Sequence, residues 1–281
     1  MNSSARTKQR VAWVMLWAAG VTAILILALI VGYVLAQGIG SIDLDFLLTP
    51  PAGGLSGEGG ISTVIVSTVY LIVLTMAIAT PLGIGAAIYL AEYAADSWLT
   101  RTARYGVETL AGVPSIIFGL FGFALFVTIL HFSFSILSGA LTLACLALPT
   151  LICAAEEAIK AVPSSYREAG LALGATKWQT ITRVVLPAAL PGVITGIILC
   201  IGRAVGETAC LYVTMGSSGA MPTSILSSGR TLSLHLYYLA METRALDKAM
   251  ATGVVLIIII LIINWLTKWL SQRLYAKMRG R

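Results

Sequence analysis

The stretch TLAGVPSIIFGLFGFALFVTILHFSFSILSGALTLACLALPTLICAA, residues 109–155, contains no Asp, Glu, Lys or Arg over 47 residues. A single helix of that length would be about 70 Å long, whereas the hydrocarbon layer of a bilayer is only about 30 Å thick. The stretch is long enough for two membrane-spanning helices with a turn near residues 131–135. It therefore predicts a helical hairpin inside a membrane.

The composition of the whole chain also indicates a membrane protein. Of the 281 residues, 58% are hydrophobic and only 11% are charged, and the mean hydropathy is +0.93. A soluble domain carries about a quarter charged residues, so this chain lacks the polar residues that would cover a surface in water. Its net charge of +6 comes from basic residues between apolar runs, a pattern that fits membrane orientation better than nucleic-acid binding.

Four further apolar runs complete a prediction of six transmembrane helices. Each is long enough to cross the bilayer; they are residues 11–36, 61–91, 188–214 and 249–267. The first run is too long for the apolar part of a signal peptide, and no clear cleavage site follows it, so we expect it to be retained. Residues 225–246 are also apolar but contain four ionisable side chains, and we expect an amphipathic or re-entrant segment on the outer face.

The distribution of Lys and Arg predicts the orientation. With the N-terminus inside, 14 of these residues fall in inner segments, three fall in outer segments, and Arg203 lies within a span. The positive-inside rule then places both termini in the cytoplasm. We expect an all-α, multi-pass protein of the cell (inner or plasma) membrane, divided into residues 1–60 (tail, first helix and outer loop), 61–270 (a transmembrane domain of five helices) and 271–281 (a basic tail).

Signals for catalysis or metal binding are weak. The four cysteines lie singly in apolar stretches without a C-x-x-C pair or a His cluster, which favours buried free thiols over a metal site. No Gly-x-x-x-x-Gly-Lys-[Ser/Thr] sequence occurs, so the chain has no P-loop for ATP. We expect no enzymatic activity in this chain, and no cofactor bound by it.

Residues 161–187, AVPSSYREAGLALGATKWQTITRVVLP, form the most informative polar segment. Ser165 and Glu168 have the spacing of a capping box, which predicts a helix that begins at Tyr166. Gly174 suits the C-terminal end of this helix, because glycine readily adopts the left-handed conformation found there.

A second helix is predicted directly after Gly174. Thr176 and Gln179 repeat the capping-box spacing, and we expect Pro187 to interrupt this helix and Pro191 to lie in the first turn of the fifth span. The loop is thus helix–glycine–helix at the membrane face. Such an element serves either as an ordinary amphipathic linker or as a docking surface for a soluble partner.

The full spacing of this loop resembles the EAA loop of ABC import permeases, in which Glu-Ala-Ala is followed by Gly and then by Ile-x-Leu-Pro. Here Gly170 replaces the second Ala and Val184 replaces the Ile. In that family the loop inserts into a cleft on the ATPase and transmits its closure. The resemblance implies an ATPase-coupling role for Ser165, Glu168, Ala169, Gly170, Gly174, Leu186 and Pro187.

Two charges lie within the fifth apolar run, in IGRAVGETAC, residues 201–210. The i, i+4 spacing of Arg203 and Glu207 predicts that they share one helix face, about 18 Å into the membrane from Pro191. A charge at that depth costs at least about 3 kcal/mol, so it should face a polar path or a partner. The two side chains form either a structural ion pair or part of a substrate path that also includes Thr208.

A substrate path of this composition would favour phosphate over sulfate. A guanidinium offers paired donors that match phosphate oxygens. Phosphate at neutral pH still carries a proton that can be donated to Glu207, whereas sulfate has none and would be repelled by the carboxylate. Gly202 and Gly206 would allow a neighbouring helix to approach closely.

The string Arg-Ala-x-Gly-Glu-Thr-Ala, residues 203–209, resembles phosphate ABC permeases, in which Pro usually follows. Here Cys210 stands in its place, so the resemblance does not extend to a proline kink at this position. Residues 81–93 and 113–119 add to the resemblance, which runs from about residue 61 to the C-terminus. Chain length, the short N-terminal tail and Leu-Thr-Pro-Pro before the Gly-rich loop favour the PstA type over the PstC type.

This resemblance implies a type I ABC importer permease fold and a permease subunit of an ATP-driven inorganic phosphate importer that works by alternating access. The implied partners are a second permease subunit (PstC type), an ATPase dimer (PstB type) that holds ATP and Mg, and an extracytoplasmic phosphate-binding protein (PstS type) that meets residues 37–60 and 215–248. Two alternatives stay open: an ABC permease for another oxyanion or solute, and an ATP-independent secondary transporter or channel. A purely structural or signalling role would leave the buried Arg203 unexplained.

Overall fold

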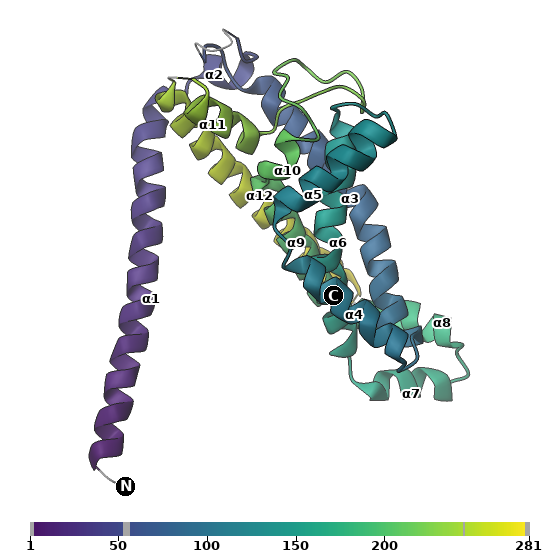
Figure 1. The fold of residues 1–281 in the computed structure, drawn as a ribbon. Helices are drawn as coiled ribbons and strands as arrows, with labels where there is room; N and C mark the ends of the chain where they lie inside the picture. Colours follow the sequence, from purple (N-terminus) through teal and green to yellow (C-terminus); the bar gives the residue numbers. More distant parts are fainter. Residues whose placement is uncertain (1–2, 53–56, 244, 279–281) are drawn as a thin grey trace.

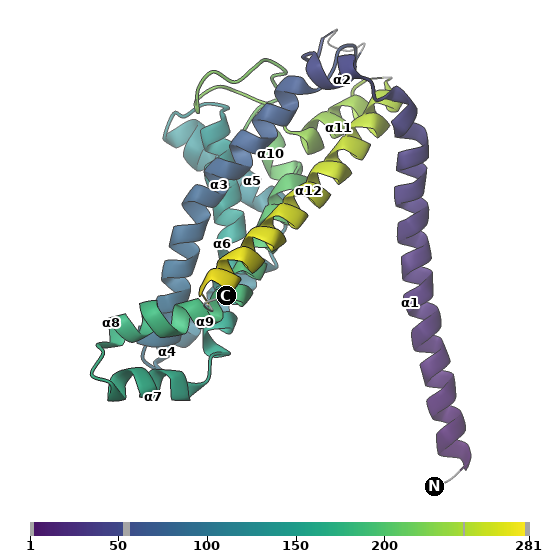
Figure 2. The same ribbon diagram turned by 180° about the vertical axis from the view of Figure 1, so that it is seen from behind.

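A computed structural model describes residues 3–52, 57–243 and 245–278, and these residues are organised as helices (Figures 1 and 2). The α-helices are α1 (Ser3–Gly38), α2 (Leu44–Leu48), α3 (Ser62–Ile88), α4 (Trp98–Ala111), α5 (Ser115–Gly122), α6 (Ile136–Lys160), α7 (Ser164–Ala172), α8 (Lys177–Thr180), α9 (Leu186–Gly206), α10 (Ala209–Tyr212), α11 (Leu232–Met241) and α12 (Leu246–Met278). Wider π-helical segments follow α3, α5 and α8, over Tyr89–Tyr93, Phe123–Ile129 and Ile181–Val185, and a short 3-10 turn, Ile39–Ser41, follows α1.

The membrane-spanning helices number five or six among the described residues. Five helical stretches are long and apolar enough to cross a bilayer: Lys8–Ser41, Ser62–Tyr93, Ile136–Lys160, Lys177–Gly206 and Leu246–Trp269. The sixth exists only if the bent pair Trp98–Ala111 and Ser115–Ile129, which meet at 102°, counts as one span. The predicted all-α membrane fold is therefore confirmed.

The structure corrects the first half of the predicted hairpin. The turn forms where we expected it, with His131 and Ser133 in the left-handed region at φ of 56° and 55°. The helix before it breaks at Pro114, because a proline disfavours the helical conformation in the residue that precedes it. The apolar piece that remains, Ser115–Ile129, is about 22 Å long and is too short by itself to cross the hydrocarbon.

α6 lies at the centre of the core and packs against α3 and α9. Small residues allow these helices to approach closely, as is typical of helices packed in a membrane. A Cβ atom added at Gly83 on α3 would lie 2.7 Å from the Leu151 side chain on α6, and one at Gly122 on α5 would collide with the hydroxyl of Thr142 on α6.

α1 stands apart from the other helices over most of its length (Figures 1 and 2). Near its C-terminal end it packs on α12, where Gly38 lies against the backbone of Met250 and Val34 lies against Gly253. The apolar side chains of α1, such as Trp17, Leu25 and Leu29, are exposed. Lipid or another protein must cover this helix, because such a long apolar surface is not stable in water.

The two ends of the molecule carry different elements (Figure 1). α7 and α8 lie at the end predicted to be cytoplasmic, which we call the inner end; the N-terminal end of α1 lies toward it. α2 and α11 lie at the opposite, outer end. Residues 225–246 do not form a span: α11 is a 10-residue helix whose Leu232, Leu234 and Leu239 are buried.

The close contact between α3 and α6 can be tested with two valine substitutions. Gly83→Val should lower the unfolding free energy of the isolated chain by about 1–3 kcal/mol, because the added methyl groups overpack against the buried Leu151. Gly85→Val is the matched control on the same helix, since no atom of another described helix lies within 4 Å of the Cβ position at Gly85. Thermal unfolding in detergent measures both variants, and equal midpoints for the two would contradict this packing.

Candidate functional site

The fifth span ends sooner than we predicted. α9 stops at Gly206, Glu207 is extended with φ −73° and ψ 132°, and the short α10 begins at Ala209. The expectation of one continuous helix over residues 188–214 is therefore wrong, and Arg203 and Glu207 do not share a helix face. The interruption forms without a proline at position 210, because Gly206 is a poor helix former and the exposed backbone groups find other partners.

These partners come from both sides of the break. The Glu207 N–H donates to the Ala204 carbonyl at 3.4 Å, and the Tyr212 N–H donates to the Thr208 carbonyl at 3.0 Å. The Ser233 hydroxyl on α11 donates to the Glu207 carbonyl at 2.7 Å. Since an unpaired backbone group in hydrocarbon costs several kcal/mol, α11 stabilises the break.

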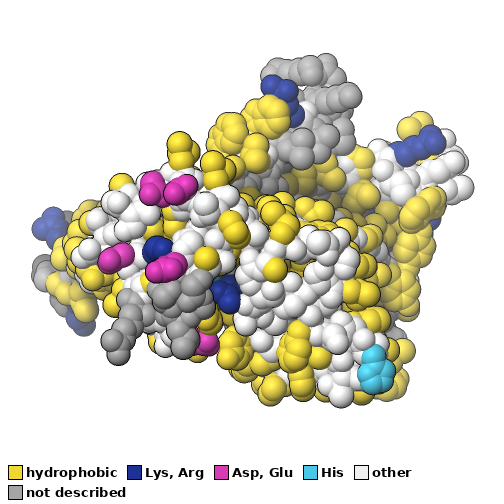
Figure 3. Space-filling model, turned by 90° about the horizontal axis from the view of Figure 1, so that it is seen from above, with side chains coloured by type: hydrophobic (Ala, Val, Ile, Leu, Met, Phe, Trp, Pro, Cys, Tyr) yellow, Lys and Arg dark blue, Asp and Glu magenta, His cyan; other side chains and the backbone are white. Residues whose placement is uncertain are grey.

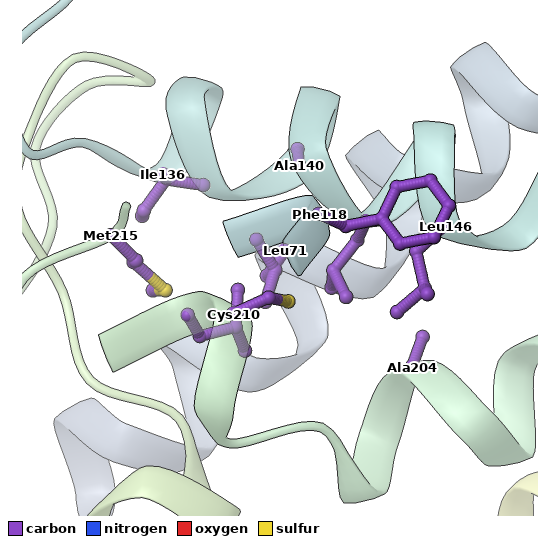
Figure 4. Packing of buried hydrophobic residues seen from close by; sticks show 10 residues of the cluster. Leu71, Phe118, Ile136, Ala140, Leu146, Ala204, Cys210 and Met215 are labelled. Atoms are coloured by element: carbon purple, nitrogen blue, oxygen red, sulfur yellow. The ribbon is translucent and has the colours of Figure 1, made fainter. Parts of the chain in front are cut away.

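The break is packed firmly against the core (Figure 4). Ala204 precedes it and Cys210 follows it, and both belong to a buried cluster with Leu71 and Phe118. A Cβ atom at Gly119 on α5 would lie 2.8 Å from the Cα of Cys210, so α5 and α10 are in close contact. These contacts fix the position of the break relative to α5 and α6.

The side chains predicted to line a substrate path lie around the break. Arg203, Glu207 and Thr208 are half-buried, and within the described part of the chain no hydrogen bond or ion pair engages their side-chain atoms. The structure therefore does not form the Arg203–Glu207 ion pair. It leaves a guanidinium, a carboxylate and a hydroxyl near a break in the helix.

One face of α9 is open along its length. No atom lies within 4 Å of the Cβ positions at Gly202 and Gly206, so the close helix approach that we expected at these glycines does not occur within the described residues. A groove of about 680 Å³ follows this face from Pro191 to Gly202, and Lys268 of α12 lines its other wall. The groove leads from the inner end toward Arg203.

α7 begins differently from our prediction. It starts at Ser164, directly after Pro163, and the helix has no side-chain cap. The capping box of Ser165 and Glu168 is therefore wrong; the fixed φ of Pro163, −56°, already suits a helix start. Ser165, Glu168 and Ala169 are all exposed on α7.

The turn between α7 and α8 follows the prediction. Gly174 has φ +80°, its N–H donates to the Leu171 carbonyl at 2.9 Å, and the Ala175 N–H donates to the Gly170 carbonyl at 3.2 Å. This pair of hydrogen bonds is the Schellman motif. The capping box of Thr176 and Gln179 also forms, so the helix–glycine–helix loop is confirmed.

The structure explains why glycine stands at position 170. A Cβ atom there would lie 2.8 Å from the Thr180 side chain, and both residues are buried. The alanine of the EAA pattern would require Thr180 to move. Gly170 thus lets α7 lie close to the helix that leads back into the membrane.

Pro187 does not end this second helix, contrary to our expectation. Ile181–Val185 form a π-helical turn just before it, and the chain stays helical from Lys177 to Gly206. In a regular helix the ring of Pro187 would clash with the carbonyl of residue 183; the wider turn accommodates it. Leu186 and Pro187 are half-buried at this junction.

Ion pairs that sequence reasoning missed hold the loop on the membrane domain. Arg167 of α7 contacts Glu92, after α3, at 2.6 Å, and it also donates to the carbonyls of Ile159 and Val162 at the end of α6. The Glu92 side chain is only 7% exposed. The sequence signal that comes closest to predicting this ion pair is the position of the acidic Glu92 at the end of the second apolar run.

A second cluster joins α4 to α6. Arg104 contacts Glu156 at 2.7 Å and donates to the Leu90 carbonyl at 2.6 Å, and Lys160 contacts the same Glu156 oxygen. Glu156 is buried at this junction. Together the two clusters cap the inner ends of α3 and α6 with arginine side chains, which satisfy the last carbonyls of these helices.

The loop presents apolar side chains outward. Leu173 is 89% exposed, and Tyr166, Leu171 and Trp178 are also exposed. These residues lie beyond the apolar helices, at the inner end, on a segment that is otherwise polar. An exposed apolar patch of this kind is typical of a protein interaction site.

Comparison with known proteins identifies the family. The family described as "Binding-protein-dependent transport system inner membrane component" matches residues 79–280. The chain belongs to this family. It is thus a multi-pass inner membrane permease subunit of an ABC importer.

Similar proteins cover nearly the whole of this permease. It is 34% identical to the "Probable ABC transporter permease protein YqgI" of Bacillus subtilis (strain 168), over 92% of this chain and 94% of the relative. It is also 34% identical to the "Phosphate transport system permease protein PstA 1" of Mycobacterium tuberculosis (strain ATCC 25618 / H37Rv), over 92% and 86%. The resemblance to PstA-type permeases that the sequence suggested is confirmed.

Solved structures share the fold. A bacterial alginate ABC transporter in complex with an alginate pentasaccharide-bound periplasmic protein has a TM-score of 0.67 at 16% identity, covering 97% of each chain. The inward-facing MetNI methionine ABC transporter has a TM-score of 0.60 at 21% identity, covering 78% of this chain and 94% of that one. At these identities the likeness concerns the fold, which confirms the predicted type I ABC importer permease architecture.

The role of the loop anchor can be tested with Arg167→Gln. We expect ATP hydrolysis by the assembled complex to continue while uptake falls about tenfold, which corresponds to about 1.4 kcal/mol of lost coupling, because α7 is released from Glu92. Glu92→Gln should have the same effect. The control is Arg101→Gln, which breaks an exposed ion pair with Asp96 that contributes little. If Arg167→Gln and Arg101→Gln give the same uptake rate, the anchor has no role in coupling.

Proposed function

We propose that this permease carries inorganic phosphate inward across the membrane by alternating access, as part of an ATP-driven importer. The observation that carries the proposal is the break after Gly206, where the side chains of Arg203, Glu207 and Thr208 have no hydrogen-bond or ion-pair partner within the described residues. Interrupted helices in transporters mark substrate sites. The names of PstA-type relatives support the choice of substrate.

The chemistry of these groups suits a protonated oxyanion. The Arg203 guanidinium would donate to two phosphate oxygens, and the Thr208 hydroxyl would donate to a third. Glu207 would accept the hydrogen bond of the phosphate proton. Sulfate carries no such proton, so the Glu207 carboxylate would repel it. Arg203 and Glu207 together would therefore select phosphate by weakening the binding of sulfate.

ATP hydrolysis is proposed to occur on a separate ATPase dimer of the PstB type, which holds ATP and Mg, while this chain binds no cofactor. The exposed patch of Tyr166, Leu171, Leu173 and Trp178 supports this docking. Ser165, Glu168, Ala169, Gly170, Gly174, Leu186 and Pro187 are proposed to transmit closure of the ATPase, since they build the loop or its junction with the fifth span.

Two further partners follow from the surfaces that this chain leaves uncovered. A second permease subunit of the PstC type would stand opposite the open face of α9, across the path, and complete its wall. A phosphate-binding protein of the PstS type would dock on the outer segments, residues 37–60 and 215–248. In this arrangement both termini lie in the cytoplasm, as the distribution of basic residues predicts.

The test is phosphate uptake by the co-expressed complex in membrane vesicles. Arg203→Gln should lower uptake by about ten- to a hundredfold, because it removes a charged hydrogen-bond donor worth about 1.5–3 kcal/mol. Arg203→Lys keeps the charge but loses the paired donors. Its phosphate uptake should lie between that of Arg203→Gln and that of the wild type.

Assembly and basal ATP hydrolysis are checked in the same preparation, and Arg101→Gln serves as the control for loss of an arginine. Normal uptake by the assembled Arg203→Gln complex would contradict the role of this side chain. If the wild-type complex hydrolyses ATP and imports a different solute instead, the ABC permease assignment stands and the phosphate proposal fails.

A further inference from the structure

A separate pocket of about 250 Å³ opens at the outer end, between α11 and the segment around Glu58. Figure 3 looks onto this end of the molecule. Its polar side chains are Arg230, His235 and Tyr238 on one side, and Glu58 lies on the other. None of these residues belongs to the break at Glu207.

Arg230 is an unusual residue in this pocket, because it is only 9% exposed. Its Nε donates to the Ser217 carbonyl at 2.9 Å, and its Nη2 donates to the same oxygen. The guanidinium also lies 4.0 Å from the centre of the Tyr238 ring. No carboxylate of the described residues lies within ion-pair distance of it, and a buried cation without a counter-charge is unfavourable.

The hydrogen-bond pattern leaves donors available in the pocket. Arg230 Nη1 lies 3.2 Å from His235 Nδ1, and because a guanidinium only donates, Nδ1 must accept and the ring proton is on Nε2. Burial, and then the charge of Arg230, lower the pKa of His235 to about 3, so the ring is neutral. Each terminal nitrogen of Arg230 keeps one further N–H, and His235 keeps its Nε2–H.

We propose that this pocket is an oxyanion site at the outer mouth of the path, in which Arg230 and His235 donate to the oxygens of the bound ion. Glu58 at the rim would accept the proton of hydrogen phosphate, as proposed for Glu207 at the break. The proposal rests on the proposed phosphate function only for the identity of the oxyanion.

The pocket is linked directly to the break in the fifth span. His235 lies on α11, and Ser233, two residues earlier, donates to the Glu207 carbonyl at 2.7 Å. An oxyanion bound at Arg230 would therefore contact the same short helix that stabilises the break. Acidic side chains gather on one side of the outer end (Figure 3), so we expect an ion delivered by a docked protein rather than one collected from solution by charge.

The test measures how fast a thiol at the rim reacts. The complex carrying Ala52→Cys, an exposed residue that lines the pocket and has no proposed role in binding, is placed in lipid nanodiscs and treated with a charged maleimide, with and without inorganic phosphate. At ten times the dissociation constant, bound phosphate should slow the reaction about tenfold. Asp45→Cys is the control, because this residue is exposed on α2 outside the pocket and its labelling should not depend on phosphate.

Adding Arg230→Gln to the cysteine variant should abolish the protection of the thiol by phosphate. Arg230→Lys keeps a positive charge, in case the loop needs one to fold, and should weaken this protection. Assembly and ATP hydrolysis are measured for each complex. Equal reaction rates with and without any oxyanion would overturn the proposal, and so would protection that requires only a docked binding protein. Protection by sulfate and not by phosphate would support the oxyanion site and contradict the phosphate function.

Discussion

A polar group inside an apolar layer must find its partner within the protein, and the break after Gly206 is where this constraint governs the structure. Three hydrogen bonds to backbone groups of the break satisfy this constraint, and the donor of one of them is the Ser233 hydroxyl on α11. α11 is itself held by its first turn: the Leu234 N–H donates to Thr231, and the Leu232 N–H donates to Thr68 of α3 at 2.9 Å. A continuous set of hydrogen bonds thus joins α3, α11 and the break.

The inner end connects to the break through one continuous helix. From Lys177 to Gly206 the chain is helical over 30 residues, which is about 45 Å. One end carries the junction with the loop proposed to contact the ATPase, and the other carries Arg203. The Arg167–Glu92 pair and the close contact of Gly170 with Thr180 hold α7 on this helix and on α3. In the proposed cycle, movement of the loop would therefore shift Arg203 without an intervening flexible joint.

Patterns in the sequence predicted the parts that depend on local chemistry. The turn near residues 131–135, the turn at Gly174 and the Thr176 capping box each rest on a few neighbouring residues, and they form as expected. The first half of the hairpin predicted for residues 109–155 does not, because the helix breaks at Pro114. The capping box predicted at Ser165 does not form, because α7 already begins directly after Pro163. Contacts between distant segments carried no sequence signal: Glu92 and Arg167 are 75 positions apart, and Ser233 and Glu207 are 26 apart. The i, i+4 spacing predicted that Arg203 and Glu207 share a helix face, and this prediction is wrong because it assumed an uninterrupted helix. The contact from Ser233 that stabilises the break is likewise distant in the sequence.

The central claim is that the open face of α9 lines an aqueous path that ends at the break. The most direct measurement is the reaction of a charged thiol reagent with Gly202→Cys and Gly206→Cys in the assembled complex, in the nucleotide-free and ATP-bound states. Gly196→Cys is the comparison, because Gly196 lies against Ala154 within the core. The account predicts that positions 202 and 206 react, at rates that change with the nucleotide state, and that position 196 does not. If positions 202 and 206 stay unreactive in both states while the complex transports, that face is covered by lipid or protein and the path lies elsewhere.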